Sequence, residues 1–408
     1  MRSTMLLAFG TTMLFTALPA CGQAQPLDEP VTPVDEAPAA TGWKAVEVVG
    51  GLQRPWGIAF LPDDNFDNGL TALITEKPGR LRVMVDGELR DAAVTGLPEI
   101  FAGGQGGLMD VSLHPYFEDT RFVYITYSAG NGQSNYTALA RGVLSDDMTA
   151  LENVEVIFEV NERKRGGQHF GSRILWLPDD TMLLSIGDGG NPPSSVEGKL
   201  ARDHAQDTHA HLGKTLRLDD NGAPAPANPF MADPDAFGAV YTLGHRNIQG
   251  MDIHPETLQV WATEHGARGG DELNLIEPGN NYGWPEATYS REYAGPRISD
   301  RTSIDGAIDP VIVWTPCIAP SGLAFYTGDA DGNAALSDWQ GDLFAGGLVL
   351  RQIRRIKFDE NNQPIPGAEG QETLQFNSRI RDVRNGPDGF LYVLTDEGNG
   401  QLLRIEAE

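Results

Sequence analysis

The stretch Ser172-Arg-Ile-Leu-Trp-Leu-Pro-Asp-Asp180, followed by Met182-Leu-Leu-Ser-Ile186, decides the fold of this chain. It is an apolar strand, a turn built on Pro and Asp, and a second apolar strand. Five further copies of the phrase begin at residues 56, 108, 250, 322 and 382. Because a supersecondary unit repeated in this way stacks on its own copies, six copies predict an all-β, six-bladed β-propeller. Its blades would be four-stranded and antiparallel, around a centre that can bind a ligand.

The copies are spaced unevenly along the chain. Successive turns lie farther apart than the roughly 40–50 residues that a four-stranded blade needs, so the excess must form loops. It is largest between Asp188 and Asp252 and between Glu264 and Ala319, where most of the His, Asn, Arg and Gly clusters occur. Long loops in a compact domain are usually functional. We also expect the apolar run 402–405 to pair with a strand of the first blade and close the ring.

The composition limits the partners of the protein. The 408 residues carry a net charge of −27, with 48 Gly and 27 Pro. Abundant Gly and Pro fit many short strands joined by turns. A strongly acidic surface repels nucleic acid and anionic lipid, so we expect neither as a partner. Most of the acidic residues would keep the protein soluble, and a minority could bind a hard cation such as Ca²⁺.

The N-terminus has the pattern of an exported protein. Residues 1–20 contain an apolar run that predicts a signal peptide and is too short for a membrane span. Leu18-Pro-Ala-Cys21 resembles a bacterial lipoprotein processing site, so we expect a lipidated Cys21, with ordinary cleavage nearby as the alternative. Residues 21–42 read as a disordered tether, and the propeller would span residues 43–408. We therefore expect a periplasmic or cell-envelope protein that meets the membrane only through its anchor.

One cysteine remains within the predicted propeller. Cys317 lies in Trp314-Thr-Pro-Cys-Ile-Ala-Pro-Ser321, and a single cysteine cannot form a disulfide within the domain. It could be a small buried apolar residue or a residue of a site, and the sequence leaves both interpretations open.

His169 is the first candidate for chemistry. It lies between glycines, in Arg165-Gly-Gly-Gln-His-Phe-Gly-Ser-Arg173, just before a predicted strand. A neutral imidazole can act as a general base near pH 7, although a lone His more often only hydrogen-bonds its loop. The next strand ends in Ser185-Ile-Gly-Asp188, and an antiparallel turn would bring Asp188 back beside His169. A carboxylate at that position would orient the imidazole and raise its basicity.

Polar side chains that suit an anionic ligand occur in two further segments. Leu243-Gly-His-Arg-Asn247 places a guanidinium next to an amide. Arg379 and Arg381 alternate, so they share one face of an extended segment and could clamp a polyanion. The alternatives are an anchored turn for the first segment and solvent exposure for the second. Gln105 adds a polar side chain in a glycine-rich loop at the entry to a blade.

The densest cluster runs from Glu264 to Asn274 and continues through Tyr282 to Pro285. Its glycines expose backbone carbonyls, and carboxylates stand beside them. Oxygen-rich loops of this type suit Ca²⁺, although the spacing is not that of an EF-hand.

Together, these segments resemble the soluble quinoprotein glucose/sorbosone dehydrogenase family, and the chain is similar to its bacterial aldose sugar dehydrogenase branch. The resemblance covers most of residues 43–408, with the segments around Gln105, His169, Asp188, Arg246, Asp271, Tyr282 and Arg379 in the same order. It implies a six-bladed propeller that binds pyrroloquinoline quinone (PQQ) and Ca²⁺ near its axis. The implied reaction oxidises an aldose sugar at C1 to a lactone, with hydride transfer to the quinone and an unknown final electron acceptor.

The resemblance also implies roles for single residues. His169 would take the proton of the anomeric hydroxyl, Asp188 would support it, and Arg246 would polarise the quinone oxygens. The other implied ligands are, for the cofactor, Asn247, Arg379, Arg381 and Trp314; for the substrate, Gln105 and Gln168; for the cofactor Ca²⁺, the carbonyls of Gly266 and Ala267; and for a second, structural Ca²⁺, Glu272 and Tyr282.

Two departures from the family pattern qualify this interpretation. Gln168 stands where glucose-specific relatives have an Asp, which indicates an altered substrate range. The segment Gly346-Gly-Leu-Val-Leu-Arg351 lacks the family's Lys, so Arg351 could substitute for it or the cofactor would be held more weakly. Two other hypotheses remain. A Ca²⁺-dependent propeller lactonase would need a metal caged by carboxylates and Asn on the axis, and a non-catalytic binding propeller would have lost its cofactor.

Overall fold

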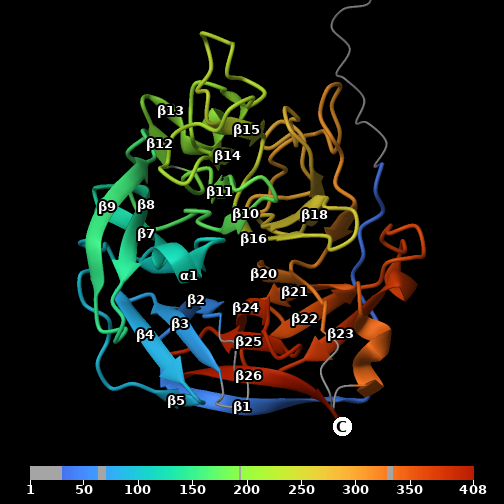
Figure 1. Ribbon diagram of the computed structural model, residues 1–408. Helices are drawn as coiled ribbons and strands as arrows, with labels where there is room; N and C mark the ends of the chain where they lie inside the picture. The colour runs from blue at the N-terminus through green and yellow to red at the C-terminus, as the bar shows by residue number, and fades with distance from the viewer. Residues whose placement is uncertain (1–29, 63–69, 193, 329–333) are drawn as a thin grey trace, which may run out of the picture.

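The computed structural model describes residues 30–62, 70–192, 194–328 and 334–408. Six four-stranded antiparallel sheets follow one another around a ring (Figure 1). This arrangement confirms the predicted all-β, six-bladed propeller. The predicted signal peptide and Cys21 lie outside the described residues.

Each blade runs outward from its first strand at the centre of the ring. The strands of blades one to three are β2 (Pro55–Phe60), β3 (Thr71–Glu76), β4 (Arg80–Val85) and β5 (Glu88–Leu89); β6 (Leu108–Leu113), β7 (Phe122–Asn131), β8 (Ser134–Leu144) and β9 (Leu151–Glu159); β10 (Ile174–Trp176), β11 (Met182–Ile186), β14 (Lys214–Leu218) and β15 (Val240–Leu243). Those of blades four to six are β16 (Ile248–Ile253), β17 (Val260–Glu264), β18 (Asp271–Ile276) and β19 (Ile312–Trp314); β20 (Pro320–Phe325), β21 (Leu343–Gly347), β22 (Gln352–Ile356) and β23 (Gln371–Gln375); β24 (Ile380–Asn385), β25 (Leu391–Thr395), β26 (Gly400–Ala407) and β1 (Trp43–Leu52).

The remaining elements are short. They are the hairpin β12 (Ser195–Val196) and β13 (Lys199–Leu200), the helix α1 (Phe117–Thr120), and the 3₁₀ helices Ala201–Gln206, Ala334–Trp339 and Ala368–Gly370. In the part of the chain that the structure describes, no helix is long and apolar enough to cross a membrane.

The ring is closed by the two ends of the folded chain. β26 pairs with β1 in antiparallel register, from Trp43 opposite Ala407 to Leu52 opposite Gly400. The expected pairing of residues 402–405 is therefore present. Its partner is the outer strand of the sixth blade, however, and not a strand of the first blade.

The apolar core lies between the blades. Each pair of neighbouring blades shares one cluster of buried side chains; Leu73 and Val111, for example, belong to the cluster between blades one and two. The other five pairs have equivalent clusters. Both faces of a blade are thus buried, which explains why the strands read as continuous apolar runs.

Charged residues connect the blades along the axis. Equivalent positions of the six inner strands hold Gly57, Asp110, Arg173, Gly250, Gly322 and Asp382. Arg173 is 1% exposed and binds Asp110 at 2.8 Å and Asp382 at 2.9 Å. A Cβ at Gly57 would lie 2.8 Å from Asp110 Oδ1, and one at Gly322 would collide with Asp382. The glycines therefore leave the room that the ion pairs occupy.

The prediction of a disordered tether at residues 21–42 is wrong for its described part. Val34 forms a parallel bridge with Trp314, and Ala39 forms one with Thr373. The segment therefore lies along β19 and β23, the outer strands of blades four and five. The composition of the segment did not predict this pairing, because it uses the unpaired backbone groups of the outer strands. Backbone pairing requires no apolar side chains.

Candidate functional site

A buried His–Asp pair lies at the start of the third blade. β10 and β11 are antiparallel, with Ile174 opposite Leu184, so the loop before β10 meets the loop after β11. His169 Nδ1 lies 2.6 Å from Asp188 Oδ1, and the two side chains are 3% and 1% exposed. The hairpin thus brings Asp188 beside His169.

The protonation of this pair follows from its surroundings. Burial opposes the charge of Asp188, but the charges of His169 and Arg246 and the hydrogen bonds outweigh it, so the pKa of Asp188 is lowered. Trp284 Nε1 donates to Asp188 Oδ2 at 2.9 Å, and Gly190 N–H donates to Oδ1. Burial, then the charge of Arg246, lowers the pKa of His169. A neutral imidazole that donates from Nδ1 to a carboxylate has Nε2 as its proton acceptor.

Two glycine-rich loops fix the backbone of His169. Its φ of 47° is left-handed, a conformation that costs energy for a residue with a side chain. Its N–H donates to Gln105 Oε1 at 2.8 Å, and the N–H of Gln105 donates to the carbonyl of Gly167 at 2.6 Å. Gln168 Oε1 accepts from the backbone N–H of Asn191 at 3.3 Å. Both candidate substrate ligands, Gln105 and Gln168, thus lie at the His169 segment.

Arg246 connects the His169–Asp188 pair to the loop that contains the predicted calcium ligands Gly266 and Ala267. It follows β15 and is 2% exposed. Its Nη1 donates to the carbonyls of His265 at 3.0 Å and Gly266 at 2.6 Å, and its Nη2 donates to Asn191 Oδ1 at 2.8 Å. The guanidinium also lies 5.4 Å from the Trp284 ring. Burial, then the charges of Arg246, His169 and Arg381, lowers the pKa of His265 well below its usual value. These charges therefore converge around His265.

Arg381 and Arg379 both reach Asp396. Arg381 is buried and donates to Asp396 Oδ2 at 2.8 Å and to Gln249 Oε1 at 2.9 Å, whereas Arg379 is exposed and lies 3.3 Å from the same carboxylate. Although burial raises the pKa of Asp396, the neighbouring arginines outweigh it and lower this pKa to about 2.

The structure does not bring Trp314 to this cluster. Its indole lies in the core between blades four and five, and its Nε1 donates to Gln371 Oε1 at 2.9 Å.

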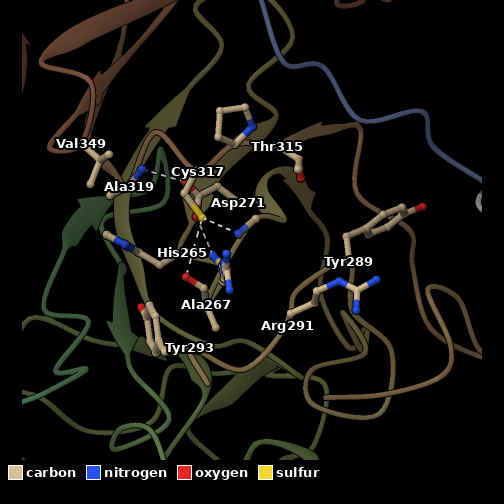
Figure 2. Close-up of a pocket in the computed structure, with 14 residues that line it drawn as sticks. His265, Ala267, Asp271, Tyr289, Arg291, Tyr293, Thr315, Cys317, Ala319 and Val349 are labelled. Atoms are coloured by element: carbon tan, nitrogen blue, oxygen red, sulfur yellow. Dashed lines mark hydrogen bonds between the residues drawn. The ribbon is translucent and has the colours of Figure 1, made fainter. Parts of the chain in front are cut away.

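A cavity of about 700 Å³ opens beside His265 (Figure 2). Its wall includes Gly266, Ala267, Asp271 and Cys317, and Figure 2 shows Tyr293 and Val349 at its edge. Cys317 is partly buried on this wall, where burial raises the pKa of its thiol. Of the two interpretations of Cys317, the structure therefore favours a residue of a site.

The loop after β18 adds cavity residues that the sequence did not single out. Tyr289, Arg291 and Tyr293 line the wall (Figure 2). The available signal was the excess length of the loop between Glu264 and Ala319. Val349 lines the cavity, while Arg351 Nη1 donates to the carbonyl of Asn377 at 2.9 Å. Arg351 itself is not a residue of this wall.

The carbonyls of Gly266 and Ala267, the predicted calcium ligands, face different partners. That of Gly266 accepts from Arg246, and that of Ala267 lies 3.8 Å from the thiol of Cys317. Asp271 braces the loop by accepting from the N–H groups of Gly266 and Ala319, both at 2.7 Å. Within the described ranges, no three His, Cys, Asp or Glu side chains form a metal-binding cluster. A cation here would therefore depend on backbone oxygens.

The second predicted calcium position contains two adjacent carboxylates. Glu272 lies opposite Glu264 in the β17–β18 pair, and Asn274 Nδ2 donates to both side chains. Burial, then the charge of Glu264, raises the pKa of Glu272 well above its usual value. Tyr282 uses its hydroxyl on the backbone of Leu275 and Glu277. The carbonyl of Tyr282 is therefore the atom that could bind a cation. The two neighbouring carboxylates would favour such binding, because a cation offsets their repulsion.

Comparisons with known proteins agree with this geometry. The Glucose / Sorbosone dehydrogenase family model matches residues 52–404. An uncharacterised Synechocystis protein, slr1608, is 51% identical over 373 residues, covering 89% of this chain and 86% of that protein. The aldose sugar dehydrogenase YliI of Escherichia coli is 36% identical over 357 residues, covering 87% and 90%.

A solved structure supports the same assignment. The PQQ-bound form of an aldose sugar dehydrogenase from Streptomyces coelicolor matches with a TM-score of 0.68 at 26% identity, covering 91% of this chain and 100% of that one. The family match spans nearly the whole propeller, from the start of the first blade to the closing strand. This chain belongs to the glucose/sorbosone dehydrogenase family.

Proposed function

We propose that this protein is a PQQ- and Ca²⁺-dependent aldose dehydrogenase that oxidises the sugar at C1 to a lactone. The observation that carries the proposal is the buried His169–Asp188 pair, held at 2.6 Å beside Arg246. A general base oriented by a carboxylate is what removal of a hydroxyl proton requires. The PQQ-bound relative supports the choice of cofactor.

The polar atoms of the candidate site fit a quinone that carries carboxylates, although of the four residues named next only His265 lines the cavity itself. Among the described residues, several buried side-chain nitrogens lack a hydrogen-bond partner, and four of them belong to residues of the candidate site: Arg246 Nε, Asn247 Nδ2, His265 Nε2 and Arg381 Nε. Buried polar groups in native proteins are almost always paired, so these atoms indicate a ligand. Three belong to Arg and Asn side chains, which can only donate from these nitrogens, and the carboxylate and quinone oxygens of PQQ are acceptors. Arg268 and Arg291 add positive charge to the cavity wall.

The residues of the chain would act on the sugar as follows. Nε2 of His169 accepts the proton of the anomeric hydroxyl, while Asp188 holds Nδ1–H and stabilises the imidazolium that forms. Gln105 and Gln168 position the sugar next to Nε2. Arg246 supplies a fixed positive charge where negative charge develops. When bound, PQQ supplies the acceptor for the C1 hydride.

Calcium would bind through the carbonyls of Gly266 and Ala267, with a second ion at Glu272 and the carbonyl of Tyr282. The first ion would polarise the cofactor as a Lewis acid, and the second would offset the repulsion between Glu272 and Glu264. Hard cations prefer oxygen ligands of this kind.

Export and substrate choice complete the proposal. We place the protein in the periplasm or cell envelope, attached by Cys21, with a sugar as its small-molecule partner. Gln168 places a neutral amide where glucose-specific relatives have an Asp. The preferred sugar would therefore differ from glucose and would be one whose binding needs no carboxylate at this position.

The test is a titration of purified apo-protein with PQQ in the presence of Ca²⁺. The expected result is a change in quinone absorbance at a defined stoichiometry, together with oxidation of aldoses by an artificial electron acceptor without NAD. The absence of both PQQ binding and sugar oxidation would contradict the proposal. Hydrolysis of lactones without PQQ would instead favour the lactonase. The axis speaks against a lactonase, because Asp110 and Asp382, which could cage a metal, are already paired with Arg173.

A further inference from the structure

Lys164 is buried directly behind the His–Asp pair. It is 2% exposed, and its Nζ donates to the carbonyl of Gln168 at 2.6 Å and lies 3.6 Å from the centre of the Phe170 ring. Among the described residues, it has no ion-pair partner. The two contacts of its ammonium thus lie on either side of His169 in the sequence.

The stem of Lys164 packs on the other half of the pair. A Cβ placed on Gly189, the residue after Asp188, would lie 3.3 Å from Lys164 Cδ. The backbone of Lys164 is fixed by reciprocal hydrogen bonds with Asn135 in β8, at 2.9 and 3.0 Å. Lys164 therefore lies between the loop that holds His169 and the loop that holds Asp188, and a rigid strand supports it.

A lysine in this place is expensive. Removing an ammonium from water without a contacting carboxylate costs several kcal/mol, and burial lowers the pKa of Lys164 to about 7, although the charge of Asp188 opposes this. A neutral donor could hold the carbonyl of Gln168 at less cost. The charge itself therefore has a use beside the catalytic pair.

We propose that Lys164 is a positioning residue for His169: its ammonium fixes the carbonyl that precedes His169 and adds a positive charge behind the His169–Asp188 pair. The inference rests on the proposed function only in that His169 is the base. The titratable and charged groups that face the pair are Asp188 after β11, Arg246 after β15 and His265 after β17. Asp188 favours imidazolium, whereas Arg246 and Lys164 disfavour it.

The direction of the effect follows from these charges. Lys164 is charged below about pH 7, the range in which His169 gains its proton, because the pKa of His169 is itself lowered. Removing the ammonium therefore raises the pKa of His169. Lys164→Met removes the charge and keeps an unbranched stem over Phe170, while Lys164→Arg keeps the charge.

The first experiment follows the histidine titrations of full-length apo-protein by NMR, with the His169 signal assigned by its loss in His169→Ala. The midpoint of His169 is expected to rise by about half a pH unit or more in Lys164→Met and to return toward the wild-type value in Lys164→Arg. An unchanged midpoint in Lys164→Met, or equal displacement in both variants, overturns the proposal. If Lys164→Met does not fold, Lys164→Gln provides the same comparison. This readout requires no PQQ, so it stands even if the proposed function fails.

The second experiment measures kcat/KM against pH with the PQQ-loaded enzyme. In Lys164→Met the acid limb is expected to move to higher pH by the same amount, and the affinity for PQQ is expected to stay within about twofold. Loss of activity at all pH values with an unshifted limb would indicate a purely structural lysine and would overturn the proposal.

Discussion

The ion pairs on the propeller axis and the candidate site bury polar groups in opposite ways. On the axis, Arg173 lies between Asp110 and Asp382, and each of these charges has an opposite charge within 3 Å. At the candidate site, Asn247 Nδ2 and His265 Nε2 are buried without a partner among the described residues. Both arrangements bury polar groups at a cost. On the axis, opposite charges within the chain offset this cost, whereas at the candidate site a bound ligand would offset it. The difference separates a stabilising element from a binding site.

The largest expected effect comes from breaking the ion pairs on the propeller axis. Arg173→Met removes the nearer guanidinium from the buried carboxylates of Asp110 and Asp382 and leaves them with Arg384, at 3.3 and 3.2 Å. Loss of a buried ionic partner costs about 3–5 kcal/mol of the free energy of unfolding. Chemical denaturation of the apo-protein measures it. Lys44→Met is the matched control, since Lys44 pairs with Glu406 at 3.7 Å and is half exposed. The control should cost less than about 1 kcal/mol. Equal losses of unfolding free energy in the two variants would show that the axial ion pairs do not stabilise the fold.

At the candidate site, His169→Ala should remove turnover and leave the fold intact. Loss of a general base costs typically about 10²–10⁴-fold in rate. The turnover of PQQ-loaded enzyme with an aldose measures this loss, and the PQQ titration should remain close to that of the wild type. The exposed His209 provides the control in His209→Ala, which should change neither quantity. Retained turnover in His169→Ala would assign the base elsewhere.

Asp252, on the inner strand β16, makes the stability of the fold depend on pH. Burial raises the pKa of Asp252 from 3.8 to about 6. Because the folded pKa exceeds the unfolded one, its contribution to stability is fully present below about pH 4 and is lost as the pH rises through 6. Asp252→Asn can still accept from the N–H of Phe325 and cannot ionise. The variant should gain stability over the wild type between pH 4 and 7, by up to about 3 kcal/mol. Denaturation midpoints across this range check it, and a constant difference would contradict the shift.

The smallest expected effect concerns one unpartnered donor. Asn247→Asp keeps the oxygen that accepts from Gly171 N–H at 3.0 Å and removes the unpaired Nδ2. The affinity for PQQ should fall by about tenfold or more, which is about 1.4 kcal/mol. Absorbance titration measures the fall. Undiminished affinity would place the cofactor away from Asn247 and remove the distinction between the two regions.

Part of the site was readable from local patterns. The apolar phrases predicted the blades, and the hairpin between His169 and Asp188 predicted their proximity, because an antiparallel turn of known length returns the chain to its start. The pairs Arg246–Asn247 and Arg379–Arg381 could be recognised because their members are one or two residues apart in the sequence. Contacts between distant segments could not. Nothing local indicated that Trp314 faces the core toward Gln371, or that Tyr289 and Arg291 line the cavity.

By itself, the sequence determined the repeat, the number of blades and the types of residue that gather in the long loops, since these depend on periodicity and spacing. The tertiary structure decided which polar groups are paired. Arg173 and Arg246 are both buried arginines, and only the packing of six blades shows that the first meets two carboxylates while the second meets carbonyls and retains a free nitrogen. The physical reason is that pairing depends on distances of a few ångströms between segments far apart in the chain, which the order of the residues does not encode locally.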